Sequence, residues 1–422
     1  MSHRPVVLVV AAADMEAEAY RGYCLQSVAA AYDVVLITGE EPSWEVPYLR
    51  DCVVVPDPAD PVQLSAAGQA LADRYDLAGV FTWTEWYLVP VARLARRLGL
   101  PTNAPEVMQA CRNKAVSRSL FAQHGVPSAA SVTVRTEAEA EAAAERIGYP
   151  VVLKPAAHAA SIGVIRADTP GQLTAAYAFA KKAAGLGQES TSVLVEEYLD
   201  GPEVSVECVT YRGKTTVVAV TRKTVSEPPY FEELAHVVDA ADPLLDVVAP
   251  AACAAIRALR ITDGVSHVEM RLVDGQPRLV EVNGRIAGDM IGHLVHLATG
   301  IDLPRAAADI ACGRAPDLTP NRSSAAAIQL IYPDVSGTLR RVYFDGICPR
   351  WLERVHFQHQ AGDPLLLPAD GGTMFTARIG YLITTAPTAD LARARAQQAA
   401  RRLHIDIAPL AGDASGTGGR AA

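Results

Sequence analysis

Three polar residues spaced two apart lie about two thirds of the way along the chain. Glu281, Asn283 and Arg285 occupy alternate positions in the apolar stretch LVEVNGRIAGD, residues 279–289. Alternate side chains of a β-strand share one face, so a carboxylate, an amide and a guanidinium should lie side by side. Such groups are costly to bury without partners. The spacing therefore raises the question of what this row of three side chains binds.

A second carboxylate can lie beside this row of three side chains, on the opposite strand of a hairpin. The pattern predicts strands at 266–273 and 277–283 around the turn DGQP, so that Glu269 can face Glu281. Two carboxylates at that distance repel each other unless a cation lies between them. Carboxylate and amide oxygens suit Mg²⁺, and Arg285 could then hold phosphate or carboxylate oxygens bidentately. The alternative is a set of solvated acids on one face of a hairpin.

A lysine and a run of small residues indicate where phosphates could bind. Lys154 ends the apolar strand VVLKP, so its ammonium group must reach water or meet an anion. The segment AAHAASIGV follows at 156–164. Its small residues, with Ser161 and Gly163 among them, would let backbone N–H groups approach phosphates closely. A lysine that simply reaches the surface is the alternative.

Acidic residues also follow the next apolar strand, in VLVEEYLDGPEVSVE. Backbone groups at a strand edge could pair with an adenine ring at Glu196, Glu197, Tyr198 and Leu199. Glu203, after a Gly-Pro turn, could accept hydrogen bonds from ribose hydroxyl groups, as acids do in other nucleotide sites. Acids that cap a strand in solvent are the alternative.

The elements that must position these residues fall into two parts. The first hundred residues alternate apolar strands with helices, which predicts a parallel sheet with covered faces. No GxGxxG follows the first strand, so the usual dinucleotide fingerprint is missing. Later residues predict two helices in PEVMQACRNKAVSRSLFAQHGVP, a hairpin at YRGK, and a closing strand and helix in MFTARIGYLITTAPTADLARARAQQAARRLHI. The fold class predicted is α/β, α+β overall.

Composition excludes several classes of protein. The length of 422 residues suggests two to four domains, and the net charge of −9 argues against a nucleic-acid binder. Seven cysteines without a CxxC pair argue against a disulfide framework or a zinc ribbon. The N-terminal apolar run is too short for a signal peptide or a membrane span, so we expect a cytoplasmic protein with no membrane partner. The Gly- and Ala-rich ending GDASGTGGRAA is predicted to be disordered.

Taken together, these motifs resemble the ATP-grasp superfamily. The segments that carry the resemblance are CRNKAVSRSLFAQHGVP, YPVVLKP, VEEYLDGPEVSVE and HVEMRLVDGQPRLVEVNGRIAGD, in this order. Two more segments, PYFEELAHVVDA and ARIGYLITTAPTADLARARAQQA, make the chain most similar to the L-amino acid ligases, which form dipeptides in bacilysin-type pathways.

The resemblance covers nearly the whole chain and implies an ATP-grasp fold. It implies an N-terminal Rossmann-like domain with a parallel sheet over 1–105. Linker helices and a small central lid follow over 106–200. A larger α+β catalytic domain follows over 201–412, with a tail at 413–422.

The resemblance also implies a role for each matched residue. The expected ATP-binding residues are Lys114, Lys154, Ser161, Gly163, Glu196, Glu197, Tyr198, Leu199 and Glu203. The expected metal ligands, for Mg²⁺ or alternatively Mn²⁺, are Glu269, Glu281 and Asn283. Arg285 and Lys154 match catalytic residues, with Arg285 holding the acyl phosphate and the tetrahedral intermediate. The expected substrate-binding residues are Glu233, His236, Arg285, Gly288 and Asp289.

Some positions depart from the family pattern or have a plainer interpretation. The phosphate loop is poorer in glycine than in many family members. Asp289 stands where a bulky residue can narrow the substrate pocket, and an acid there could select a polar or cationic substrate. Outside the family context, His236 would be a loop or core histidine. His267 could simply pack beside Glu269.

The implied reaction joins a carboxylate to an amine. The carboxylate of an amino acid or another acid would take the γ-phosphate of ATP, and an amine would then displace phosphate from the acyl phosphate. The expected partners are ATP, a divalent metal ion and small-molecule substrates, and a homodimer is left open. Two alternatives also stay open: activation of bicarbonate as in carboxylases, and an ATP-binding module without catalysis.

Overall fold

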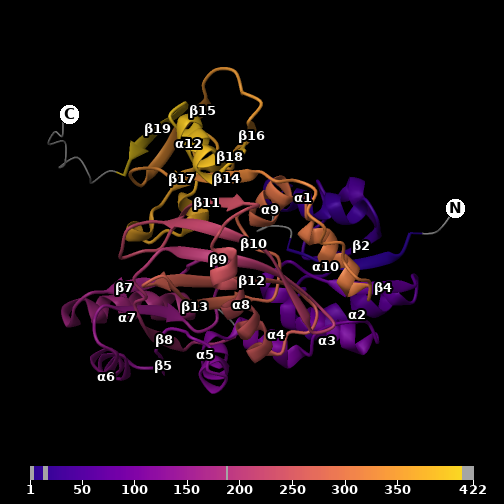
Figure 1. The fold of residues 1–422 in the computed structure, drawn as a ribbon, viewed down its shortest axis with the longest axis horizontal. Coiled ribbons are helices and arrows are strands. Elements are labelled where there is room, and N and C mark those ends of the chain that lie inside the picture. Colours follow the sequence, from indigo (N-terminus) through magenta and orange to yellow (C-terminus); the bar gives the residue numbers. More distant parts are fainter. Residues whose placement is uncertain (1–3, 13–17, 187–188, 411–422) are drawn as a thin grey trace.

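Four β-sheets, with helices between and around them, make up the structure (Figure 1). The computed structural model describes residues 4–12, 18–186 and 189–410. The predicted ending GDASGTGGRAA lies outside these residues. The mixed α/β fold class predicted from the sequence is confirmed.

The first sheet is parallel, in the order β3-β2-β1-β4. Its central strand, VVLVV, is buried throughout, as expected for a parallel strand covered on both faces. The elements are β1 Val6–Val10, α1 Glu18–Ala29, β2 Asp33–Thr38, η1 Val46–Tyr48, β3 Leu49–Val54, α2 Pro61–Ala72, β4 Leu77–Phe81, η2 Glu85–Tyr87 and α3 Leu88–Arg97.

The second sheet is antiparallel, in the order β5-β8-β6-β7. The predicted pair of helices, α4 and α5, precedes it, and α6 and α7 pack against its strands. The elements are α4 Pro105–Arg112, α5 Lys114–Gln123, β5 Ser131–Val134, α6 Glu137–Ile147, β6 Val151–Pro155, β7 Ile165–Ala167, α7 Pro170–Ala184 and β8 Val193–Glu197.

The third sheet has eight strands in the order β13-β12-β9-β10-β11-β14-β18-β16, all paired antiparallel. Helix α8 packs against β9, β10 and β13, whereas α9 and α12 pack against strands further along the sheet. The elements are β9 Glu203–Tyr211, β10 Lys214–Val225, β11 Glu233–Asp239, α8 Leu245–Leu259, β12 Gly264–Val273, β13 Gln276–Asn283, α9 Ile291–Thr299, α10 Leu303–Ala311, β14 Ala325–Ile331, β16 Leu352–Phe357, β18 Gly380–Ala386 and α12 Ala389–Ala400.

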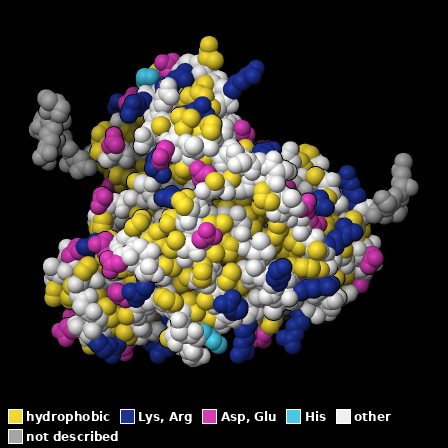
Figure 2. Space-filling model, in the orientation of Figure 1, with side chains coloured by type: hydrophobic (Ala, Val, Ile, Leu, Met, Phe, Trp, Pro, Cys, Tyr) yellow, Lys and Arg dark blue, Asp and Glu magenta, His cyan; other side chains and the backbone are white. Residues whose placement is uncertain are grey.

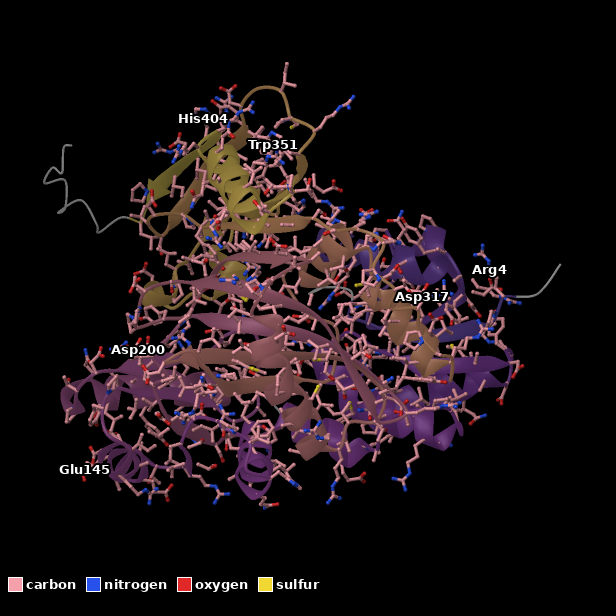
Figure 3. The ribbon with its side chains drawn as sticks, in the orientation of Figure 1. Arg4, Glu145, Asp200, Asp317, Trp351 and His404 are labelled. Carbon is pink, nitrogen blue, oxygen red and sulfur yellow. The ribbon has the colours of Figure 1, made fainter. Side chains whose placement is uncertain are left out.

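A small fourth sheet, β17-β15-β19, completes the C-terminal part. Its elements, with the short helices beside it, are β15 Gly337–Phe344, β17 Pro364–Leu365, η3 Pro368–Asp370, α11 Met374–Ala377 and β19 Leu403–Pro409. Figure 3 marks the extent of the molecule: Trp351 and His404 lie in the upper lobe, with Glu145 at the opposite, lower end.

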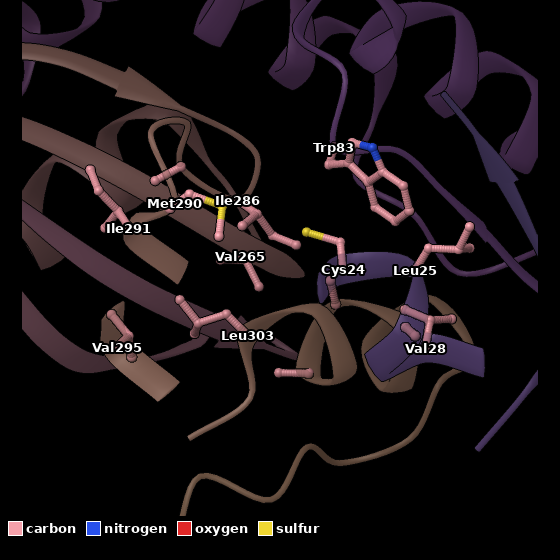
Figure 4. Close-up of a cluster of buried hydrophobic side chains, with 14 of the residues drawn as sticks. Cys24, Leu25, Val28, Trp83, Val265, Ile286, Met290, Ile291, Val295 and Leu303 are labelled. Atoms are coloured by element: carbon pink, nitrogen blue, oxygen red, sulfur yellow. The ribbon is translucent and has the colours of Figure 1, made fainter. Parts of the chain in front are cut away.

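The first sheet and the third sheet share a hydrophobic core. In Figure 4, the Cys24 side chain of α1 points toward Ile286 of the C-terminal half, and Leu25, Val28 and Val265 belong to the same cluster. The packing extends to β4 and α10, where a Cβ atom on Gly79 would stand 2.4 Å from the Ala311 carbonyl oxygen. A larger residue would clash there, so glycine at position 79 allows β4 and α10 to pack closely.

The two strands predicted around DGQP appear as β12 and β13, and the predicted hairpin at YRGK joins β9 to β10. One part of the C-terminal prediction is wrong, because Met374–Ala377 forms a short helix ahead of the predicted strand. Acidic and basic side chains are interspersed on the face shown in Figure 2. Within the described ranges, no helix has the length and apolar character needed to cross a bilayer.

Candidate active site

A cavity of about 740 Å³ lies where the first three sheets meet. Its walls include residues from α1, from the segment after β4, from the second sheet and from the third sheet. The predicted site residues that line it are Lys114, Lys154, Ser161, Glu196, Glu197, Tyr198, Leu199, Glu203, Glu233, His236, Glu269, Glu281, Asn283, Arg285, Gly288 and Asp289. Gly163 is the one predicted residue that does not line this cavity.

The strand order of the third sheet explains why distant residues meet here. Crossing the sheet, β13 carries Glu281 and Asn283, β12 carries Glu269, and β9 carries Glu203. The next two strands, β10 and β11, carry Lys223 and then Glu233. Neighbouring strands lie about 4.8 Å apart, so β13 and β11 are separated by about 19 Å. The cavity is long enough for an extended nucleotide and a second small molecule.

The two carboxylates proposed as metal ligands face each other across the hairpin. Glu269 and Glu281 are register partners of β12 and β13, so their side chains share one face. Asn283 Nδ2 lies 3.4 Å from Glu269 Oε1, and Lys114 Nζ lies 2.8 Å from Glu281 Oε1. This set of oxygen donors fits Mg²⁺, which needs only one or two carboxylates when substrate phosphates supply further oxygens.

Lys154 is buried rather than at the surface, so the plainer interpretation of this lysine is wrong. Its ammonium group lies 2.6 Å from Glu196 Oε2, and Arg118 holds both oxygens of the same carboxylate at 2.8 and 3.0 Å. Burial opposes ionisation of Glu196, but Arg118 and Lys154 hold its pKa at about 2. Two cations therefore share one carboxylate, which leaves positive charge available for phosphates.

The sheet order limits the strand edge that was expected to meet adenine at Glu196 and Glu197. Strand β8 is paired on both sides, by β5 and by β6, so Glu196 has no free strand edge, and the Glu197 N–H group donates to the Ala130 carbonyl oxygen at 2.9 Å. The Glu197 carboxylate pairs with Arg278 at 2.8 Å. Tyr198 and Leu199 follow the strand and also line the cavity, and adenine binding along residues 196–199 stays a prediction.

The small-residue loop folds tightly beside the cavity. Ala160 and Ser161 adopt left-handed backbone angles, with φ of 59° and 53°. Gly163 is also left-handed, and a Cβ atom there would lie 2.3 Å from the Ala183 Cβ atom of α7. The role expected for Gly163 therefore changes: its lack of a side chain allows the loop to pack on α7, while Ser161 lines the cavity.

Glu203 lies between two cations that the sequence analysis missed. Its carboxylate is 3.1 Å from Lys223 Nζ and 3.1 Å from Arg271 Nη2. Arg271 Nη1 also donates to the Leu199 carbonyl oxygen at 3.2 Å. The group expected to meet ribose is thus held in place beside the hinge.

A cluster of four residues forms another wall, with Glu233 and His236 on β11, Asp289 after β13 and Arg378 just after α11. His236 is fully buried, as a core histidine would be, yet its Nε2 lies 3.4 Å from Asp289 Oδ2 and its Nδ1 lies 3.9 Å from Glu233 Oε2. Arg378, which the sequence analysis missed, lies 2.6 Å from Asp289 Oδ1. Although burial opposes ionisation, Arg378 and His236 hold the pKa of Asp289 well below its usual range. The charge of Asp289 is therefore balanced already, which weakens the expectation that it selects a cationic substrate.

Arg285 is fixed by a residue from the N-terminal sheet. Glu85, in η2 after β4, pairs with the Arg285 Nε atom through one oxygen and with Arg112 at 2.8 Å through the other. Burial raises the pKa of Glu85, but Arg285 and Arg112 outweigh that effect and bring it to about 2. Sequence spacing gave no sign of Glu85, because 200 residues separate it from Arg285.

His267 packs beside Glu269, in line with its plainer interpretation. Its Nε2 lies 3.1 Å from Glu269 Oε1, and its Nδ1 lies 2.8 Å from Glu207 Oε1. Burial lowers the pKa of His267, but the Glu207 charge and the hydrogen bonds to both carboxylates raise it to about 9. His267 thus holds the Glu269 side chain toward the cavity.

Comparisons with known proteins find ATP-grasp domains in this chain. The family model described as an ATP-grasp domain matches residues 147–293, and the model of the ATP-grasp N-terminal domain matches residues 27–102. An uncharacterized protein, y4rH, from Sinorhizobium fredii is 29% identical over 346 residues, which are 81% of this chain and 70% of that protein. The alanine–anticapsin ligase of Bacillus subtilis is 27% identical over 276 residues, which are 59% of this chain and 57% of that enzyme.

A solved structure of the L-amino acid ligase from Bacillus licheniformis superposes with a TM-score of 0.79. The match has 22% sequence identity and covers 97% of this chain and all of that one. At this identity the superposition shows that the two proteins share a fold.

Replacing Glu85 by Gln should destabilise the protein in a pH-dependent way. The pKa of Glu85 falls from 4.5 to about 2 on folding, so the ionised group stabilises the folded state by about 3 kcal/mol above pH 4.5. This contribution fades as the pH falls from 4.5 toward 2, by about 1.4 kcal/mol per pH unit. Denaturant unfolding of wild type and Glu85→Gln should therefore differ most at pH 7 and less at pH 3.5.

The exposed Glu106, changed to Gln, serves as the control and should show little difference at either pH. A stability gap between wild type and Glu85→Gln that stays constant from pH 7 to 3.5 would contradict this assignment.

Proposed function

Because the chain belongs to the ATP-grasp superfamily, we propose that it is an ATP-dependent carboxylate–amine ligase that forms an amide bond, of the dipeptide type. One observation carries the proposal. A single cavity joins a wall of lysines and carboxylates suited to a triphosphate with a second polar wall at Glu233, His236, Asp289 and Arg378. A protein that only bound ATP would have no need of the second wall.

The first chemical step would take place near Lys114 and Lys154. A substrate carboxylate attacks the γ-phosphorus atom of ATP, and ADP leaves, so that an acyl phosphate forms. Catalysis of such a transfer depends mainly on positioning and on stabilisation of charge. The two lysines supply this charge from buried positions, where electrostatic interactions are stronger than in water.

The second step would take place beside Arg285. An amine attacks the activated carbonyl carbon, negative charge builds up on the carbonyl oxygen, and phosphate leaves with the oxygen that joined it to carbon. A preorganised cation stabilises such a charge at no further cost of reorganisation. Glu85 holds the Arg285 side chain in place from the N-terminal sheet, so we assign Glu85 a positioning role.

A divalent metal ion would be held by Glu269, Glu281 and Asn283. When bound, it would neutralise charge on the phosphate oxygens during transfer. Behind these ligands, His267 fixes the orientation of Glu269, in the way that neighbouring hydrogen-bond partners orient metal ligands elsewhere.

The wall around Glu233 and Asp289 supports an amino acid as one substrate. It presents carboxylates and a guanidinium within one cluster, beside the buried His236. A zwitterion matches a wall that carries both signs of charge, whereas bicarbonate needs no ammonium-binding group. The alanine–anticapsin ligase and the L-amino acid ligase among the similar proteins support the same choice.

A pairwise screen of amino acids tests the proposal. With ATP and Mg²⁺ present, we expect ADP and phosphate release to require an amino acid, and mass spectrometry should find an amide of the two amino acids added. ADP release with bicarbonate alone would favour a carboxylase instead. Binding of ATP with no ADP formation across the full panel would favour a module without catalysis.

Changing Asp289 to Asn should alter which amino acid is used. The variant keeps the shape of the side chain but leaves the charge of Arg378 without its partner. An uncompensated guanidinium favours an anionic side chain, so the ratio of kcat/KM for acidic over basic amino acids should rise by about tenfold or more. The KM for ATP should stay within about twofold of the wild-type value, because no proposed ATP ligand contacts Asp289.

Asp309→Asn is the matched control, since Asp309 pairs with Arg305 at 2.9 Å and does not line the cavity. An unchanged substrate ratio in Asp289→Asn would show that this wall does not set specificity.

A further inference from the structure

Lys223 is a buried lysine to which the proposed reaction gives no role. It lies on β10, and only 3% of its side chain is exposed. Its Nζ atom lies 2.5 Å from Glu233, 3.1 Å from Glu203 and 3.4 Å from Glu269. These three carboxylates are assigned, in turn, to the amino-acid, ribose and metal parts of the site.

The other carboxylate proposed as a metal ligand is also paired with a lysine. Glu281 lies 2.8 Å from Lys114 Nζ, so each of the two acidic metal ligands already faces an ammonium group. Across the described ranges of the chain, no group of three or more His, Cys, Asp or Glu side chains is arranged to hold a metal ion. In the cavity without nucleotide, both carboxylates of the proposed metal site are therefore paired with lysines, although they share one face.

Lys114 and Lys223 differ in whether a bound nucleotide could draw them away from their carboxylate partners. Lys114 also donates to the His158 carbonyl oxygen at 2.7 Å, beside the small-residue loop, so the phosphates of a nucleotide can draw it away from Glu281. Lys223 has no phosphate to move to, because it is enclosed by the three carboxylates on β9, β11 and β12. Its charge stays close to Glu269 and repels any second cation that approaches.

We propose that Lys223 is a resident counter-cation that keeps divalent metal ions out of the empty cavity, so that the metal enters only together with the nucleotide. This inference rests on the proposed nucleotide and metal site. Once nucleotide is bound, ribose hydroxyl groups engage Glu203 and phosphate oxygens complete the donor set beside Glu269 and Glu281. The added negative charge of the phosphates then outweighs the repulsion from Lys223. Lys223 would thus be a positioning residue that sets the order of binding.

The test is direct titration with Mn²⁺, followed by electron paramagnetic resonance, on the full chain without nucleotide. Wild type should bind Mn²⁺ weakly on its own and tightly when ADP is added. Lys223→Met removes the charge and should bind Mn²⁺ without nucleotide at least about tenfold more tightly than wild type. Lys223→Arg keeps the charge and should behave as wild type.

Lys181→Met is the matched control, because Lys181 lies on α7 and donates to the Thr191 carbonyl oxygen outside the cavity. If circular dichroism shows that Lys223→Met does not fold, Lys223→Gln, which keeps a hydrogen-bond donor, carries the same comparison. The proposal is overturned if removing the charge changes nucleotide-free Mn²⁺ affinity by less than twofold or weakens it. Tight Mn²⁺ binding by wild type without nucleotide also overturns it.

The same preparations separate this inference from the ligase proposal. If wild type forms no ADP with any amino acid, the ligase proposal fails. The Mn²⁺ affinities of wild type and Lys223→Met can still be compared, because that titration does not depend on turnover. If wild type is an active ligase and Lys223→Met has unchanged Mn²⁺ affinity, only the role of Lys223 fails.

Discussion

The structure depends on one electrostatic constraint: a carboxylate buried in the cavity must have a cation beside it. An unpaired buried charge is far costlier than a surface charge. This cavity contains several buried carboxylates, and each of them is paired. Glu85 meets Arg112 and Arg285, Glu196 meets Arg118 and Lys154, and Asp289 meets Arg378. These pairs hold the cavity walls in position before any ligand arrives.

The same pairs join segments that are distant in the chain. Glu85 lies in η2, just after β4 of the N-terminal parallel sheet, whereas Arg285 follows the last strand of the hairpin in the third sheet. The N-terminal sheet and the third sheet also share an apolar core, in which Cys24 and Val28 of α1 belong to the same cluster as Ile286. This core keeps the two sheets in a fixed position relative to each other. The position of Arg285 therefore depends on packing between sheets as well as on the strand that precedes it.

Much of the fold could be predicted from the sequence because its signals are local. Alternating strands and helices predicted the first sheet, and the spacing of Glu281 and Asn283 opposite Glu269 predicted the face that they share. Lys154 was indicated by its place at the end of an apolar strand, and Lys114 by the family resemblance. What local reasoning could not find were residues whose partners come from distant segments. Arg378 lies 89 residues from Asp289, and Lys223 lies 46 residues from Glu269.

One further signal was present in the sequence, whereas another feature depended on the order of the strands. Lys223 falls within the alternating strand VVAVTRKTV, where a lysine on the inward face needs a buried acid. Adenine pairing at Glu196 and Glu197 was predicted from a strand edge, but sheet order places β8 between two neighbours. Strand order depends on long-range pairing, which no spacing within a single strand reveals.

The central claim is that this cavity activates a carboxylate by phosphoryl transfer and then joins it to an amine. The most direct measurement uses an amino acid whose carboxylate carries ¹⁸O, with ATP, Mg²⁺ and the amine substrate. The account predicts that one ¹⁸O atom appears in the phosphate released for each amide formed, because the carboxylate oxygen that attacks phosphorus leaves with it. Amide formation with unlabelled phosphate would contradict the account.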